Sequence, residues 1–354
     1  MVDGRASRAS ARKITSRVRP PDGRLPCISA CELHMPADLK AGLYRGLKIA
    51  LPILLSVVAI AFIGRAIDWN AALSSALDAP GWAVVSGIAL ILIQIALAGL
   101  RLRLLALSVQ MPLSWQSSTA VWSFSYLGGL VLPTAVGSEI IKGAVLLKWA
   151  RLPGRIIGVL VLERFVATVA LVLLVLVTLP FASLRAGMGH TAMLGFLCGS
   201  GLLLIGLGFA ARRRIGPGLS KLLVAFRVPS VAAQAISETL ANAPLVKCIA
   251  ISTVIHLLTL VVIGLLLFGF SSRDPFLDAI LGGPVVTFAA MLPISVGGFG
   301  IREGAFILVF GAFGVDASRA AGVGLAWWGV QTLAGLTATS LAATWLAVNR
   351  RKRA

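Results

Sequence analysis

Long uninterrupted apolar stretches constrain this chain more than any other feature of its sequence. A helix of about 20 apolar residues is long enough to cross the ~30 Å hydrocarbon core of a bilayer. The candidate membrane spans are residues 47–65, 82–100, 156–180, 192–211, 247–270 and 320–348. Because these stretches are continuous and do not alternate between polar and apolar residues, they predict helices rather than the strands of a membrane β-barrel.

The composition agrees with this interpretation. Hydrophobic residues make up 58% of the 354 positions and charged residues only 13%, and the mean hydropathy is +0.94. A soluble domain of this length could not remove so much apolar surface from water. We therefore expect an all-α, polytopic helical membrane protein.

The net charge of +19 is unevenly distributed. Lys and Arg gather near the amino terminus, in a few loops and at the carboxyl terminus, which is typical of cytoplasmic segments that meet anionic lipid. Residues 1–46 are predicted to form a disordered basic cytoplasmic arm, residues 47–348 the membrane domain and residues 349–354 a basic cytoplasmic tail. We expect a multi-pass protein of the bacterial inner membrane. Aromatic residues are not interleaved with the basic ones, so nucleic-acid binding is not expected.

The amino-terminal arm raises two further questions. Met35 opens a more ordinary start for a membrane protein, and we hypothesise that residues 1–34 are an over-extended gene prediction. Cys27, Cys31 and His34 could supply three metal ligands, but a fourth is not obvious and the spacing fits no common zinc pattern. No metal or cofactor is expected.

A helix-breaking motif occurs twice. Residues 132–137 read Leu-Pro-Thr-Ala-Val-Gly and residues 292–297 read Leu-Pro-Ile-Ser-Val-Gly, and each is followed by a charged residue beside Gly-Ala. Glycine and proline end or interrupt helices. The predicted breaks are at Pro133, Gly137, Pro293, Gly297, Gly298 and Gly300.

The two apolar regions that contain this motif, residues 115–150 and 277–314, can cross the membrane in two ways. If both crossed fully, the basic residues Lys148, Arg151 and Arg155 would face outward, against the excess of Lys and Arg expected inside. Re-entrant hairpins remove that conflict. The sequence therefore favours about six full spans plus two inverted re-entrant hairpins, a recurrent transporter design, with eight full spans as the alternative.

Ionisable residues cluster around the two motifs. Glu139 and Lys142 are three residues apart, so on a helix they share a face and can pair. Arg302 and Glu303 follow the second motif, and the adjacent pair Glu163 and Arg164 must find separate partners because neighbouring positions point about 100° apart. The predicted substrate-binding residues are Glu139, Lys142, Arg302, Glu303, Glu163 and Arg164.

Two interpretations of these charges remain open. Lys142 and Arg302 could receive an anionic lipid headgroup, since a guanidinium binds phosphate in a bidentate way. They could instead form internal ion pairs that keep the hairpins folded. Elsewhere, Arg101 and Arg103 are expected to end a span and extend to the headgroups, and His256 to form a helix–helix hydrogen bond rather than a proton relay.

The motifs resemble those of a known family. Residues 292–305 are similar to the carboxy-proximal signature of the lysylphosphatidylglycerol synthase transmembrane-region family, also called flippase-like. Residues 132–142 look like its first motif, although Ser138 stands where a second glycine is often seen, and Glu163-Arg164 is similar to its Glu-Arg pair. The resemblance covers about residues 45–348 and implies lipid translocation without identifying the lipid. In some members an aminoacyltransferase domain follows; this sequence ends at Ala354, and we expect this protein to lack that domain.

The sequence lacks the signatures of common enzymes. It contains no His-Glu-x-x-His, Gly-x-Ser-x-Gly, phosphate-binding or dinucleotide-binding motif. We therefore expect a non-enzymatic protein that moves a phospholipid, glycolipid or isoprenoid lipid with an anionic or zwitterionic headgroup. The alternatives are an accessory factor that scaffolds a lipid-modifying enzyme or glycosyltransferase through residues 212–246, and an embedded transferase that uses Glu139 or Glu303 as a base.

Overall fold

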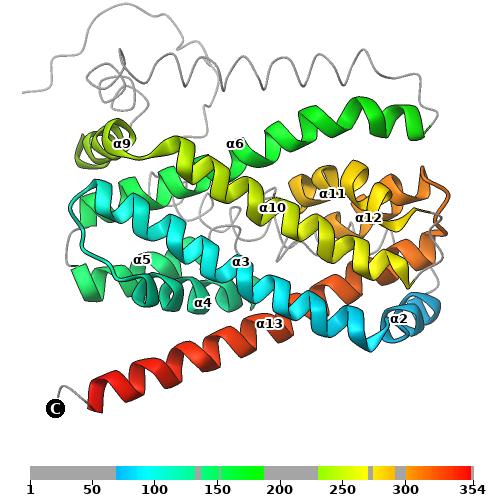
Figure 1. Ribbon diagram of the computed structural model, residues 1–354, viewed down its shortest axis with the longest axis horizontal. Coiled ribbons are helices and arrows are strands. Elements are labelled where there is room, and N and C mark those ends of the chain that lie inside the picture. The colour runs from blue at the N-terminus through cyan, green and yellow to red at the C-terminus, as the bar shows by residue number, and fades with distance from the viewer. Residues whose placement is uncertain are drawn as a thin grey trace, which may run out of the picture. The chain divides into compact units, whose positions relative to one another are not determined.

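The computed structural model describes residues 69–131, 137–150, 153–186, 230–269, 274–291 and 300–351. Within these ranges all regular secondary structure is α-helical (Figure 1). The helices are α2 (Trp69–Leu77), α3 (Gly81–Ser108), α4 (Trp115–Val131), α5 (Gly137–Ala150), α6 (Pro153–Arg185), α9 (Ser230–Asn242), α10 (Leu245–Phe268), α11 (Pro275–Met291), α12 (Ile301–Gly311) and α13 (Ala317–Arg351). The predicted arm, the predicted spans 47–65 and 192–211, and Cys27, Cys31 and His34 lie outside the described residues.

The long helices confirm a polytopic helical membrane protein. By length and composition, α3, α6 and α10 are each able to cross a bilayer. Helix α13 has 35 residues, which at 1.5 Å per residue is about 52 Å. It continues to Arg351, so the predicted tail begins within a helix. Helix α3 continues to Ser108, about two turns beyond the predicted end at residue 100.

Each motif region folds as two short helices that pack against each other. Helix α4 contacts α5, and α11 contacts α12. The helices have 17, 14, 17 and 11 residues, and an 11-residue helix is only about 17 Å long. The predicted breaks Pro133, Pro293, Gly297 and Gly298 lie outside the described residues. Gly137 begins α5, and Gly300 precedes α12 with a φ of 82° that favours glycine.

The two hairpins contact opposite halves of α13. Two glycines of α13 mark these contacts. A Cβ atom built on Gly335 would lie 3.3 Å from the ring of Tyr126 on α4, and one built on Gly324 would lie 3.3 Å from the ring of Phe306 on α12. In Figure 1, α4 and α5 accordingly lie to the left and α11 and α12 to the right. The carboxyl end of α4 and the amino end of α12 therefore both face the middle of α13.

The two larger hydrophobic clusters correspond to the two hairpins. One joins α3, α10, α11, α12 and α13 around Phe306, Phe310 and Trp327. The other joins α3, α4, α5, α6 and α10 around Leu102, Leu146 and Val159. Because α3 and α10 contribute to both clusters, they form the common support against which each hairpin packs.

Candidate functional site

A single buried carboxylate, that of Glu163 on α6, connects four helices. Its oxygens accept hydrogen bonds from Lys142 Nζ on α5 at 3.0 Å, from Trp122 Nε1 on α4 at 2.6 Å and from Arg101 Nη2 on α3 at 3.5 Å. The side chain of Glu163 is 1% exposed, and those of Lys142 and Arg101 are each 4% exposed. Ionised groups inside a membrane are costly unless they are paired, and this pairing explains how three of them persist there.

The position of the Arg101 side chain contradicts the expectation that it extends to the lipid headgroups. Its Nη1 donates to Ser252 Oγ on α10 at 2.8 Å, and its Nη2 reaches Glu163. The prediction was wrong because α3 runs on to Ser108, which places Arg101 inside the helix rather than at its end. Its guanidinium therefore turns inward to the carboxylate of α6.

The indole of Trp122 adds a second kind of contact. The Nζ of Lys142 lies 4.2 Å from the centre of the indole ring, and Cζ of Arg101 lies 5.7 Å from it. Cations at these distances are attracted to the electron-rich ring face. Neither Trp122 nor Ser252 was singled out from the sequence; the only signal for Trp122 is that it lies in a serine-rich stretch of an otherwise apolar segment.

Arg164, next to Glu163 on α6, contacts both hairpins. Its Nη1 donates to Glu139 Oε1 of α5 at 2.8 Å, and its Nη2 donates to the carbonyl oxygen of Met291, at the end of α11, at 3.4 Å. Its side chain is 36% exposed and that of Glu139 is 20% exposed. This pair is therefore the accessible edge of an otherwise buried charge cluster, which we define as Arg101, Glu139, Lys142, Glu163 and Arg164.

The partners within this charge cluster differ in part from those expected. The structure confirms that Glu163 and Arg164 take separate partners. The expected bond between Glu139 and Lys142 is replaced by Lys142–Glu163 and Glu139–Arg164 bonds. The two residues do share a face of α5, but that face packs against α6, and the opposite charges on α6 lie within direct bonding distance of both.

Arg302 and Glu303 pair with each other at the start of α12. Arg302 Nε donates to Glu303 Oε1 at 3.0 Å, and the second carboxylate oxygen accepts the backbone N–H of Gly300 at 2.7 Å. Both side chains are buried. A carboxylate at a helix N-terminus satisfies an otherwise unpaired N–H and interacts favourably with the helix dipole. The second motif therefore builds a helix start, in agreement with the structural interpretation of these charges.

His256 behaves as expected for a helix–helix contact. Its Nε2 lies 3.0 Å from the carbonyl oxygen of Ala167 on α6, so it links α10 to α6 beside the charge cluster. The described residues contain no group of three or more His, Cys, Asp or Glu side chains that could hold a metal ion.

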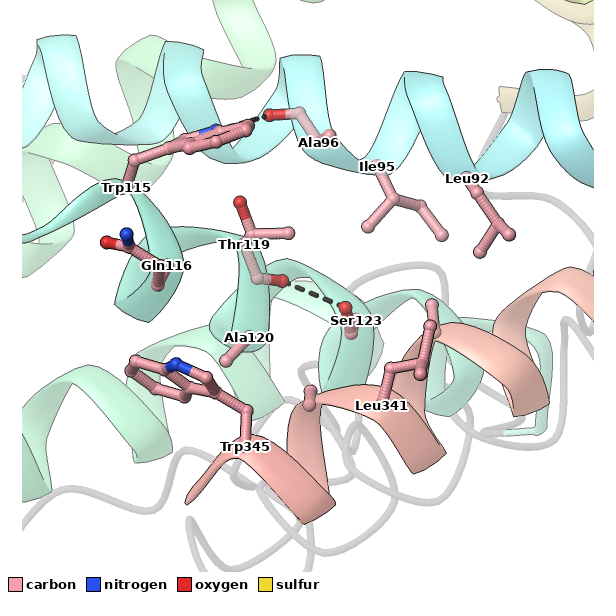
Figure 2. A pocket seen from close by; sticks show the side chains of 12 residues that line it. Leu92, Ile95, Ala96, Trp115, Gln116, Thr119, Ala120, Ser123, Leu341 and Trp345 are labelled. Atoms are coloured by element: carbon pink, nitrogen blue, oxygen red, sulfur yellow. Dashed lines mark hydrogen bonds between the residues drawn. The ribbon is translucent and has the colours of Figure 1, made fainter. Parts of the chain in front are cut away.

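An apolar pocket of about 310 Å³ lies between α3, α4 and α13 (Figure 2). The indoles of Trp115 and Trp345 face it, and Trp115 Nε1 donates to the carbonyl oxygen of Ala96 at 3.1 Å. Its lining consists of Leu92, Ile95, Ala96, Trp115, Gln116, Thr119, Ala120, Ser123, Ala338, Leu341, Ala342 and Trp345. Without an ionised group, this lining suits hydrocarbon and not a charged headgroup. The charge cluster is therefore the better candidate for a polar ligand.

Comparison with known families gives one match across most of the chain. Residues 49–338 match the model of the family described as "Lysylphosphatidylglycerol synthase TM region". Comparisons with curated proteins and with solved structures find no match. The matched range contains both hairpins and every residue of the charge cluster. The chain therefore belongs to the lysylphosphatidylglycerol synthase TM region family.

Proposed function

We propose that this protein moves a lipid with an anionic or zwitterionic headgroup between the leaflets of the bacterial inner membrane. The observation that carries the proposal is the position of Arg164, which bonds to Glu139 in one hairpin and to Met291 in the other. Membership of a lipid-related membrane family supports it. Ionisable groups beside broken helices within a membrane typically mark a transport pathway.

In this mechanism the headgroup binds at the accessible edge of the charge cluster while the acyl chains stay in lipid. Arg164 can exchange its bond to Glu139 for a bidentate bond to a lipid phosphate, because the guanidinium presents donors in a planar fork. Lys142 is deeper than Arg164 and holds Glu163 in place. Arg164 thus takes the headgroup role that the sequence suggested for Lys142 and Arg302.

Movement of one hairpin against the other would then expose the site to each leaflet in turn. Because Arg164 is bonded to both hairpins, replacing either bond by a bond to the headgroup would uncouple them. A ligand shifts the equilibrium between two arrangements of the hairpins only through contacts that differ between those arrangements. The Glu139–Arg164 bond is a contact of that kind, since it competes directly with the headgroup.

Lipid movement by the purified full-length chain tests the proposal. The protein is reconstituted into vesicles that carry a trace of phospholipid labelled with a fluorophore on its acyl chain, and a membrane-impermeant quencher is added outside. We expect label from the inner leaflet to become quenched, whereas protein-free vesicles retain it. Unchanged protection of the inner leaflet would contradict translocation. Recovery of a bound lipid-modifying enzyme or glycosyltransferase from the same preparation would then support the accessory role.

The inverted-hairpin arrangement predicts the location of Lys148 at the end of α5, where the side chain is exposed. In a cysteine-free background, Lys148→Cys should react with an impermeant thiol reagent only from the cytoplasmic side. Ser74→Cys is the matched control, because Ser74 is also exposed and lies on α2, which this topology places outside. Labelling of both positions from the same side would support eight full crossings instead.

A further inference from the structure

The charge cluster carries one positive charge more than its carboxylates can neutralise. It contains three cations, Arg101, Lys142 and Arg164, and two anions, Glu139 and Glu163. Lys142 and Arg101 share the single carboxylate of Glu163. A buried excess charge is costly in a membrane, so this arrangement favours the binding of an anion.

The described carboxylates elsewhere in the bundle are engaged or exposed, so they do not supply the missing charge. The acidic residues within the described ranges are Asp78, Glu139, Glu163, Glu238, Asp274, Asp278, Glu303 and Asp316. Asp274 and Asp278 bind Arg185, Glu303 binds Arg302, and Asp316 accepts the N–H groups at the start of α13. Asp78, just after α2, and Glu238, on α9, are exposed.

Arg101 shows a second, independent sign of an incomplete site. Its side chain is almost fully buried, yet Nε has no hydrogen-bond partner. A buried N–H group without an acceptor costs free energy and is rare in native structures. An anion bound to the cluster would offset the excess charge, and the unfilled donor shows that the described residues do not supply enough acceptors for Arg101.

We infer that the charge cluster binds a lipid headgroup with a net single negative charge, that is, a phosphodiester without a compensating amine. This inference rests on the proposed function for its lipid substrate and narrows it from anionic or zwitterionic to anionic. A phosphodiester adds one negative charge to a cluster of net +1 and leaves it neutral. A zwitterionic headgroup adds no net charge, and its ammonium would meet three cations.

Binding and movement are measured separately with phosphatidylglycerol and phosphatidylethanolamine, each labelled on the acyl chain. We expect the purified protein to bind and to translocate phosphatidylglycerol at least about tenfold better, since one added ion pair contributes roughly the energy of a tenfold preference. Arg101→Gln, which removes the excess charge, should bring the ratio toward one. Arg101→Lys, which keeps the charge, should retain the preference, and this variant separates a loss of charge from a loss of folding.

The outcomes distinguish this inference from the proposed function. Preferred binding of phosphatidylglycerol with no movement of either lipid would support the anionic site and contradict translocation. Equal binding and equal movement of both lipids would contradict the preference for an anionic headgroup and would leave the proposed translocation intact. Inorganic phosphate is included as a competitor: if it binds as tightly as phosphatidylglycerol, the site takes a free anion and the assignment to a lipid is overturned.

Discussion

Replacing Glu163 with glutamine is expected to lower the free energy of unfolding by about 3–5 kcal/mol, the range observed when one partner of a buried ion pair is removed. The carboxylate is the shared partner of Lys142 and Arg101 and accepts the indole N–H of Trp122. The substitution leaves two buried cations without a counter-charge. Unfolding of the purified protein by sodium dodecyl sulfate in mixed micelles measures the change.

The control and the rescue make this prediction specific. Glu238→Gln removes the same charge from an exposed position on α9 and should alter stability by less than about 0.5 kcal/mol. The triple replacement Arg101→Leu, Lys142→Met and Glu163→Leu should regain most of the stability, because an apolar core of similar volume replaces a buried ion cluster at little cost. If Glu163→Gln were as stable as the wild type, Glu163 would not be the structural centre of the cluster.

The second large effect is expected on lipid movement. Arg164→Gln should slow translocation in vesicles by roughly 10- to 100-fold, since hydrogen bonds to charged groups contribute about 1.5–3 kcal/mol each. Folding should be less affected than in Glu163→Gln, because the Arg164–Glu139 pair is partly exposed and such pairs contribute about 0–1 kcal/mol to stability.

Arg185→Gln is the matched control for Arg164→Gln. Arg185 is on the same helix and also binds carboxylates, those of Asp274 and Asp278, but it lies at the other end of α6, away from the hairpin ends that Arg164 joins. Its replacement should leave the translocation rate within about twofold of wild type, because the two ion pairs that it breaks, to Asp274 and Asp278, involve neither Glu139 nor Met291. Equal slowing in both variants would mean that the loss reflects damage to α6 and would contradict a headgroup role for Arg164.

Much of the fold follows from local features of the sequence. Apolar stretches predicted α3, α6, α10 and α13, because the length and hydropathy of a segment depend on its own residues. The repeated Leu-Pro-x-x-Val-Gly motif predicted that residues 115–150 and 277–314 would each be interrupted. The structure has paired short helices on either side of both motifs. The ends of α3 and α13 were predicted less well. Each helix continues through polar and charged residues, and these residues lower the hydropathy from which the end of the span was predicted.

The candidate site was predicted only in part. Sequence spacing singled out Glu139, Lys142, Glu163 and Arg164, which the structure brings together. It missed Arg101 as a member, because residues 101–108 were taken to lie beyond the membrane span. It also missed Trp122, since nothing in the chain near Trp122 indicates that its indole meets a carboxylate 41 residues away.

The sequence by itself determined the class of protein, the approximate positions of the long apolar helices, the two interruptions and the family, because each is encoded in short contiguous segments. Only the tertiary structure decided which charges pair, which are buried and that Arg164 lies between two hairpins. Those properties depend on which helix faces lie side by side. A charged side chain binds whichever opposite charge the packing brings within about 3 Å, and residues close in sequence have no advantage over residues that packing places nearer.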